Sequence, residues 1–82
     1  MNRNELEAVI KKHLHRVAPE ADLRSLDSRE DLGSALDLDS MDIYTMMVAV
    51  SEEMNVEIPE REYGNLRSLD HMLDFLLQSA EK

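Results

Sequence analysis

A serine at position 40 is the residue of this chain best placed to do chemistry. It stands in the run Asp39-Ser40-Met41-Asp42, directly before an apolar segment. A serine hydroxyl can attack a substrate when a general base activates it, can cap a helix, or can accept a group from another protein. No histidine lies near Ser40 in the sequence, and a triad with His71 would require the fold to bring the two together. We therefore expect no catalytic residue and no enzyme activity.

The acids and histidines were also considered as metal ligands. Asp37 and Asp39 match the first two ligand positions of an EF-hand calcium loop, but three of the five key positions do not fit. His13 and His15 stand two residues apart on an expected helix, so their side chains point in different directions. We expect no specific metal site, although loose binding of divalent cations to the acids remains open.

The composition predicts one small helical domain over residues 1–82. Of these 82 residues, 43% are hydrophobic, which is enough for a core and argues against disorder. Two Gly, two Pro, two Tyr and one Phe favour helices over a turn-rich sandwich or barrel. Two glycines cannot form a glycine-rich phosphate loop, and the absence of cysteine excludes disulfides and thiolate metal sites. With no leader and no membrane-spanning run evident, we expect a cytoplasmic monomer.

The net charge of −9 is concentrated in the middle of the chain. Residues 1–17 hold four bases and two acids, net +2, whereas residues 18–62 hold thirteen acids and three bases, net −10. Residues 63–82, with three acids and two bases, add −1. Because this acidity repels phosphates, we expect neither nucleic acid nor membrane as a partner. It attracts partners with basic patches, although acidic surfaces also simply keep small proteins soluble.

Pro59 at the start of a short segment and Gly64 beyond its end predict one short helix, and amphipathic spacing predicts three long ones. Their apolar residues recur at the i, i+3, i+4 spacing of a single helical face. The expected helices span residues of about 4–17, 40–54, 60–64 and 68–79. The expected N-cap residues are Asn2 or Asn4, Asp39 or Ser40, and Ser68.

Residues 18–39 form a long connection between the first two helices. Leucines recur through it, so it should be pinned to the core, and a loop this long in a compact domain usually has a function. Residues 28–31 are suited to start one short helical turn. This organisation is typical of a bundle with one long crossover.

The helix expected at residues 40–54 carries two apolar stripes where one would suffice for a core. The first consists of Ile43, Met46, Met47, Val50 and Met54, and the second of Met41, Tyr44 and Val48. A domain of this size has too little protein to bury a helix on all sides, so we expect the second stripe to be exposed for a partner. The alternative is that Met41 and Tyr44 pack beneath the long loop.

Four segments occur in a characteristic order. They are Asp31-Leu32-Gly33, Leu38-Asp39-Ser40-Met41-Asp42, Glu52-Glu53-Met54-Asn55-Val56-Glu57-Ile58-Pro59 and Leu66-Arg67-Ser68-Leu69. Together they resemble the acyl carrier protein family. The resemblance implies an all-α fold, a small four-helix bundle with a long loop between helices one and two and a short third helix. It also implies that Ser40 receives 4′-phosphopantetheine from coenzyme A through a phosphopantetheinyl transferase, with Asp39 presenting the serine and Met41 beside the arm.

The resemblance further implies a surface that acyl-transferring or acyl-modifying enzymes with basic patches would read. Its residues would be Met41, Asp42, Tyr44, Val48, Glu52, Glu53 and Glu57. The implied function is an acyl carrier of fatty acid or other lipid metabolism. The alternatives are an aminoacyl or peptidyl carrier, including a D-alanyl carrier, and an unmodified carrier-like binding subunit. Residues 34–37 depart from the family pattern and place Asp37 where glycine is common, so the pattern does not predict the loop before Ser40.

Overall fold

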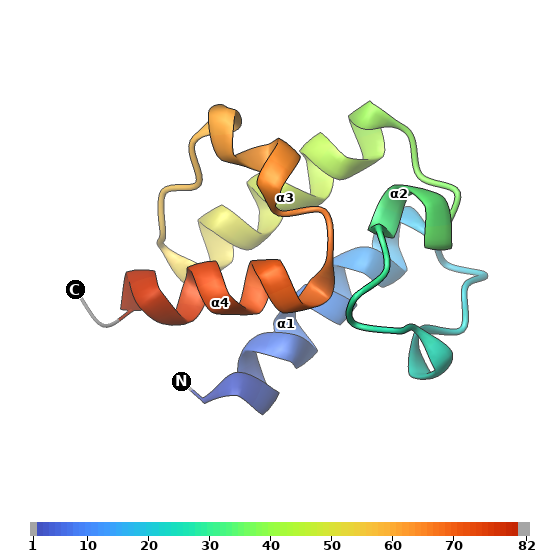
Figure 1. Cartoon of the computed structure of the whole chain (residues 1–82), viewed down its shortest axis with the longest axis horizontal. Coiled ribbons are helices and arrows are strands. Elements are labelled where there is room, and N and C mark those ends of the chain that lie inside the picture. Colours follow the sequence, from blue (N-terminus) through green and yellow to red (C-terminus); the bar gives the residue numbers. More distant parts are fainter. Residues whose placement is uncertain (1, 81–82) are drawn as a thin grey trace.

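The computed structural model describes residues 2–80, and every regular element in them is helical. The elements are α1 (Arg3–Val17), η1 (Leu23–Ser25), α2 (Leu32–Ala35), α3 (Ser40–Met54), η2 (Glu60–Asn65) and α4 (Leu69–Ala80), where η marks a 3-10 helix. Figure 1 shows α1, α3 and α4 as the long rods of the molecule and α2 as a single short turn before α3. The predicted all-α class and small helical bundle are confirmed.

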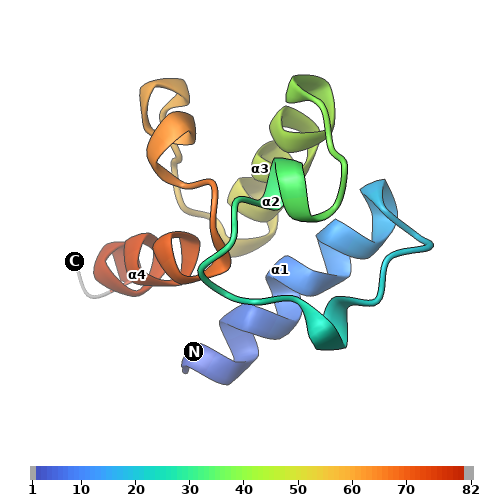
Figure 2. The ribbon, with the colours of Figure 1, turned by 45° about the vertical axis from the view of Figure 1, so that its right-hand side comes forward.

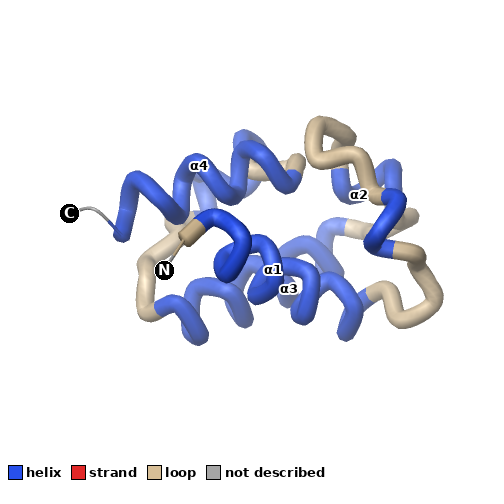
Figure 3. The backbone as a smooth tube through the Cα atoms, turned by 90° about the horizontal axis from the view of Figure 1, so that it is seen from below, coloured by secondary structure: helices blue, strands red, loops and turns tan. Residues whose placement is uncertain are grey.

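The three long helices enclose one hydrophobic core. The helix α1 packs against both α3 and α4, an arrangement that Figures 2 and 3 show from two sides. The fully or almost fully buried side chains are Leu6, Ile10, Leu14, Leu32, Ile43, Met46, Met47, Val50, Ile58, Leu66, Leu69, Met72, Leu73 and Leu76. The first predicted stripe of α3 is buried, apart from the half-buried Met54. This burial orients α3 on the core and so determines where its first residue lies.

Side-chain caps define where the helices begin and end. Asn2, one of two predicted candidates, caps α1 in a capping box with Glu5. At the end of α3, Asn55 adopts a left-handed conformation with φ 54°, which asparagine tolerates better than most residues. The Ser68 hydroxyl accepts the backbone N–H of His71 at 3.2 Å and so caps α4, as predicted.

The long connection folds differently from the prediction in one place. Residues 28–31 were expected to start one short helical turn, but only Asp31 takes part, as the N-cap of the short helix that begins at Leu32. There the carboxylate of Asp31 accepts the Ser34 N–H at 2.9 Å, and Leu32 is fully buried in the core. The Ser28 carbonyl instead accepts the N–H of Asp70 at 2.9 Å. The burial of Leu32 thus sets where the chain turns toward α3.

Candidate functional site

Ser40 is the first residue of α3, and its side chain is exposed. The cap of this helix is Asp39, whose carboxylate accepts the Asp42 N–H at 2.9 Å. In return the Asp42 carboxylate accepts the N–H of Asp39 at 3.4 Å, which completes a capping box. Because Asp39 does the capping, the Ser40 hydroxyl stays outside these hydrogen bonds. The site therefore presents a primary alcohol at a helix N-terminus.

The first turn of α3 suits an anion attached to that alcohol. A helix leaves its first N–H groups without intrahelical partners, and the capping box uses those of Asp39 and Asp42. The N–H groups of Ser40 and Met41 are the ones that remain at the positive end of the helix dipole. A phosphodiester on the Ser40 oxygen would lie beside them, so the residues present fit such a group.

The turn between α2 and α3 has a backbone conformation that the sequence pattern did not predict. Asp37 has a φ of 54°, in the left-handed region where glycine is most easily accommodated. Asp is among the residues that tolerate this region, because its short polar side chain can bond locally. The next residue, Leu38, is half-buried and donates its N–H to the Gly33 carbonyl at 2.9 Å. The turn that leads into Ser40 is therefore closed onto α2.

A bidentate ion pair between two distant segments lies next to this turn. The Arg67 Nε donates to Asp31 Oδ1 at 2.6 Å, and Arg67 Nη2 donates to Asp31 Oδ2 at 3.0 Å. The hydrogen bonds from the Arg67 side chain, followed by the one from the Ser34 backbone, hold the pKa of the Asp31 carboxyl well below its usual range. Both residues were noted in the sequence, but their pairing, 36 positions apart, left no periodic signal.

The second stripe of α3 is exposed at its N-terminal end. Met41 is 69% exposed and Tyr44 is 42% exposed, whereas Val48 is half-buried. The Tyr44 ring meets the Tyr63 ring of η2 edge to face, with 5.9 Å between the ring centroids. Tyr63 is partly buried there, and burial raises the pKa of its hydroxyl. Tyr44 therefore contacts η2, and Met41 is left largely exposed.

The predicted surface acids differ in what they contact. Glu52 and Glu57 are exposed. The carboxylate of Glu53 instead faces α1, where Oε1 lies 2.5 Å from Lys12 Nζ and 2.8 Å from His13 Nε2. The hydrogen bond from Lys12, followed by that from His13, lowers the pKa of Glu53. Glu53 therefore ties α3 to α1, a role that sequence reasoning missed.

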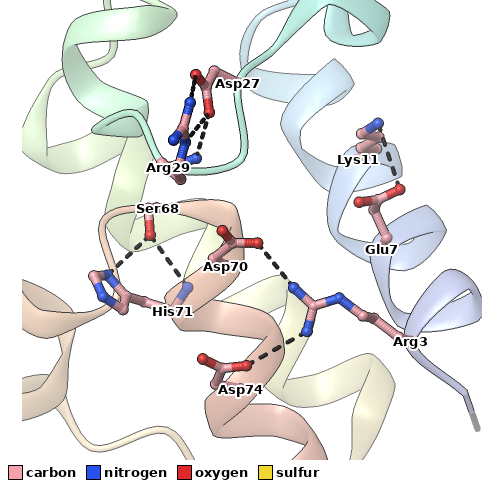
Figure 4. A network of polar contacts seen from close by, with 9 residues as sticks. All are labelled: Arg3, Glu7, Lys11, Asp27, Arg29, Ser68, Asp70, His71 and Asp74. Carbon is pink, nitrogen blue, oxygen red and sulfur yellow. Dashed lines mark hydrogen bonds and ion pairs between the residues drawn. The ribbon is translucent and has the colours of Figure 1, made fainter.

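Two of the three histidines, His13 and His71, make hydrogen bonds within the fold. His13 is 5% exposed and bonds through Nε2, while its Nδ1 has no hydrogen-bond partner among the described residues. The Nδ1 of His71 lies 2.9 Å from the Ser68 hydroxyl at the start of α4, as Figure 4 shows. Among residues 2–80, no cluster of three or more His, Cys, Asp or Glu side chains is placed to hold a metal ion.

A family model described as a phosphopantetheine attachment site matches residues 4–76 of this chain. The chain belongs to the acyl carrier protein family. An acyl carrier protein of Thermosynechococcus vestitus is 32% identical over 80 residues, which cover 93% of each chain. Mitochondrial acyl carrier proteins of Saccharomyces cerevisiae and Neurospora crassa are 29% and 25% identical over 58 and 60 residues, or 71% and 73% of this chain.

Membership of this family settles the general nature of the carrier. Members of this family are non-catalytic carriers, and their cofactor is covalently attached 4′-phosphopantetheine. The aligned segments make up 46% and 45% of the two mitochondrial relatives, so this carrier spans about half the length of those proteins. In the part of the chain that the structure describes, no helix is long and apolar enough to cross a membrane.

Proposed function

We propose that this carrier bears 4′-phosphopantetheine on the Ser40 oxygen and presents thioester-bound acyl groups to partner enzymes. The observation that supports this most directly is the exposed hydroxyl at the first position of α3, left out of the cap by Asp39. When bound, the group supplies the thiol that a chain without cysteine lacks.

The residues around Ser40 have distinct parts in this proposal. Asp39 fixes the first turn of α3 through its bond to the Asp42 N–H, so the hydroxyl points from a rigid helix end. The N–H groups of Ser40 and Met41 stabilise the phosphodiester electrostatically. The exposed side chain of Met41 would lie beside the arm. A transferase would then meet a preorganised alcohol, which lowers the entropy lost on binding.

An acyl cargo is favoured over an aminoacyl one by the relatives, which are all called acyl carrier proteins. Because this carrier spans only about half of two of them, its pathway and partners belong to the proposal as well. The location of the carrier in the cell is also part of the proposal. The sequence predicted the cytoplasm, whereas two of the relatives are called mitochondrial.

The proposed partner surface runs along α3 from its exposed N-terminal end. Met41 and Tyr44 offer apolar area, and acids on the same element and beyond offer attraction to a basic patch. The proposed residues are Met41, Asp42, Tyr44, Val48, Glu52 and Glu57, with Glu53 contributing only after it releases Lys12 and His13.

The site is tested by intact mass after incubation with coenzyme A and a phosphopantetheinyl transferase. We expect the wild type to gain the mass of one phosphopantetheine and Ser40→Ala to gain none. Ser34→Ala, which changes an exposed serine in α2, is the matched control and should be modified like the wild type. A gain that survives Ser40→Ala would refute the site, and an unmodified wild type would leave the binding-subunit alternative.

A further inference from the structure

The contact between Arg67 and the segment before α3 is more specific than a surface ion pair. Both side chains are partly buried, and two parallel N–H···O bonds join them at 2.6 and 3.0 Å. The Arg67 backbone takes part as well, because its carbonyl accepts the Leu32 N–H at 2.6 Å. Side chain and main chain of one residue thus hold two consecutive residues, Asp31 and Leu32.

Gly33 provides the room in which the guanidinium lies. A methyl group at Gly33 would stand 2.2 Å from Arg67 Nη2 and 3.2 Å from Asp31 Oδ2. Gly33 does not have a positive φ, and it lies inside α2, so its backbone conformation alone would accept alanine. The absence of a side chain at this position therefore serves the close approach of Arg67.

These contacts continue into the turn that carries Ser40. The carbonyl of Gly33 accepts the N–H of Leu38, which is two residues before Ser40. At the other end, the Asp70 N–H bonds the Ser28 carbonyl and fixes the same segment to α4. Arg67, Asp31 and Gly33 thus lie between the start of α4 and the turn before α3.

We propose that Arg67, held by Asp31 and lying against Gly33, is a positioning residue. It keeps the turn between α2 and α3 in the conformation in which the transferase modifies Ser40. The proposal rests on the proposed function, since it names how this carrier prepares Ser40. Arg67 acts through Asp31 and Gly33 and is not itself proposed to touch the cofactor.

The expected kinetic signature is a change in KM. We call the contacts of Arg67 with Asp31 and Gly33 the clamp. If the clamp is lost, the turn between α2 and α3 samples other conformations, and only the molecules in the competent conformation bind the transferase. Apparent affinity falls in proportion to that fraction, while the chemistry of the bound complex is unchanged. We expect Arg67→Ala to raise the KM of the transferase for this carrier roughly tenfold with kcat almost unchanged. Arg67→Lys, which cannot form the planar bidentate contact, should show an intermediate rise.

The matched control removes another arginine that joins distant segments. Arg3 Nη2 lies 2.8 Å from Asp70 Oδ1, and Arg3 Nη1 lies 3.4 Å from Asp74 Oδ1, as Figure 4 shows. Arg3→Ala deletes these ion pairs between α1 and α4 and leaves those of Arg67 in place. Its KM should equal that of the wild type. Equal rises in KM for the Arg3 and Arg67 variants would show a general effect of stability and overturn the proposal.

Gly33→Ala tests the role of Gly33 without removing a charge, and a double-mutant cycle with Arg67→Ala shows whether its effect acts through Arg67. Gly33→Ala should push the guanidinium off Asp31 and raise KM about as much as Arg67→Ala does. Once Arg67 is alanine, the added methyl group has no guanidinium to displace, so the double variant should resemble Arg67→Ala alone. Multiplied effects in the double variant would contradict this mechanism.

Hydrogen exchange of the unmodified carrier separates this inference from the proposed function. The Leu38 amide should exchange faster in Arg67→Ala by a larger factor than the Val50 amide in the buried part of α3, whose exchange follows only the global stability. Unchanged exchange at Leu38 would overturn the clamp, whatever the transferase does. A wild type that shows the clamp in exchange but is never modified would instead refute the proposed function and, with it, the role of the clamp in modification.

Discussion

The buried half of α3 and the segment that leads into its first residue are held by different forces. Four apolar residues of α3 are at most 4% exposed and belong to the core, in which α3 packs against α1. In residues 27–39, Leu32 is the one apolar side chain that is fully buried, Leu36 and Leu38 pack against the core only in part, and hydrogen bonds join the segment to Arg67 and Asp70. Apolar burial stabilises in proportion to area, whereas directional hydrogen bonds fix geometry with a small net gain in stability. Stability and the presentation of Ser40 should therefore respond to different substitutions.

The largest expected effect on stability comes from the core. Leu73→Ala removes a fully buried side chain of α4 and should lower the free energy of unfolding by about 2–5 kcal/mol. Urea denaturation followed by circular dichroism measures the change. Glu52→Ala, at an exposed site of α3, is the control and should shift that free energy by less than about 0.5 kcal/mol. Comparable losses in the two variants would show that α4 does not pack as described.

A smaller and pH-dependent effect is expected at the clamp. Because Arg67 lowers the pKa of Asp31, the pair stabilises the fold above the ordinary carboxyl pKa, and this contribution fades as the pH falls toward the lowered pKa. The melting temperature of Asp31→Asn should therefore lie below that of the wild type at neutral pH, and the difference should shrink below about pH 4. Thermal melts of both proteins across this range measure it. A difference that does not change with pH would mean that the Asp31 charge is not what holds Arg67.

The smallest effects are expected at the two left-handed residues, which have the same φ of 54° in the two regions. Asn55→Gly and Asp37→Gly should each change the free energy of unfolding by less than about 1 kcal/mol, since both native residues tolerate this conformation. Only Asp37→Gly should raise the KM of the transferase, because it loosens the turn before Ser40. An equal rise in KM for Asn55→Gly would erase the distinction between the two regions.

The parts of the fold with a strong local signal were predictable. The periodicity of α1, α3 and α4 gave their extents within a residue or two, and Asp39, one of the two candidates for the N-cap of α3, caps that helix. The exposure of Met41 and Tyr44 followed from the small size of the domain.

The remaining features depend on contacts between distant segments. The pairing of Asp31 with Arg67 and the use of Glu53 by Lys12 and His13 involve residues 36 to 41 positions apart, for which periodicity carries no information. The start of the short helix at Leu32 was missed because the burial of that leucine, together with the cap from Asp31, decides where it begins.

The most direct test of the central claim is the intact mass of this carrier after reaction with coenzyme A and a phosphopantetheinyl transferase. Our account predicts that the wild type gains one phosphopantetheine, which fragmentation locates on Ser40. A wild type of unchanged mass in a reaction that modifies another carrier, or a group located on any other residue, would contradict it.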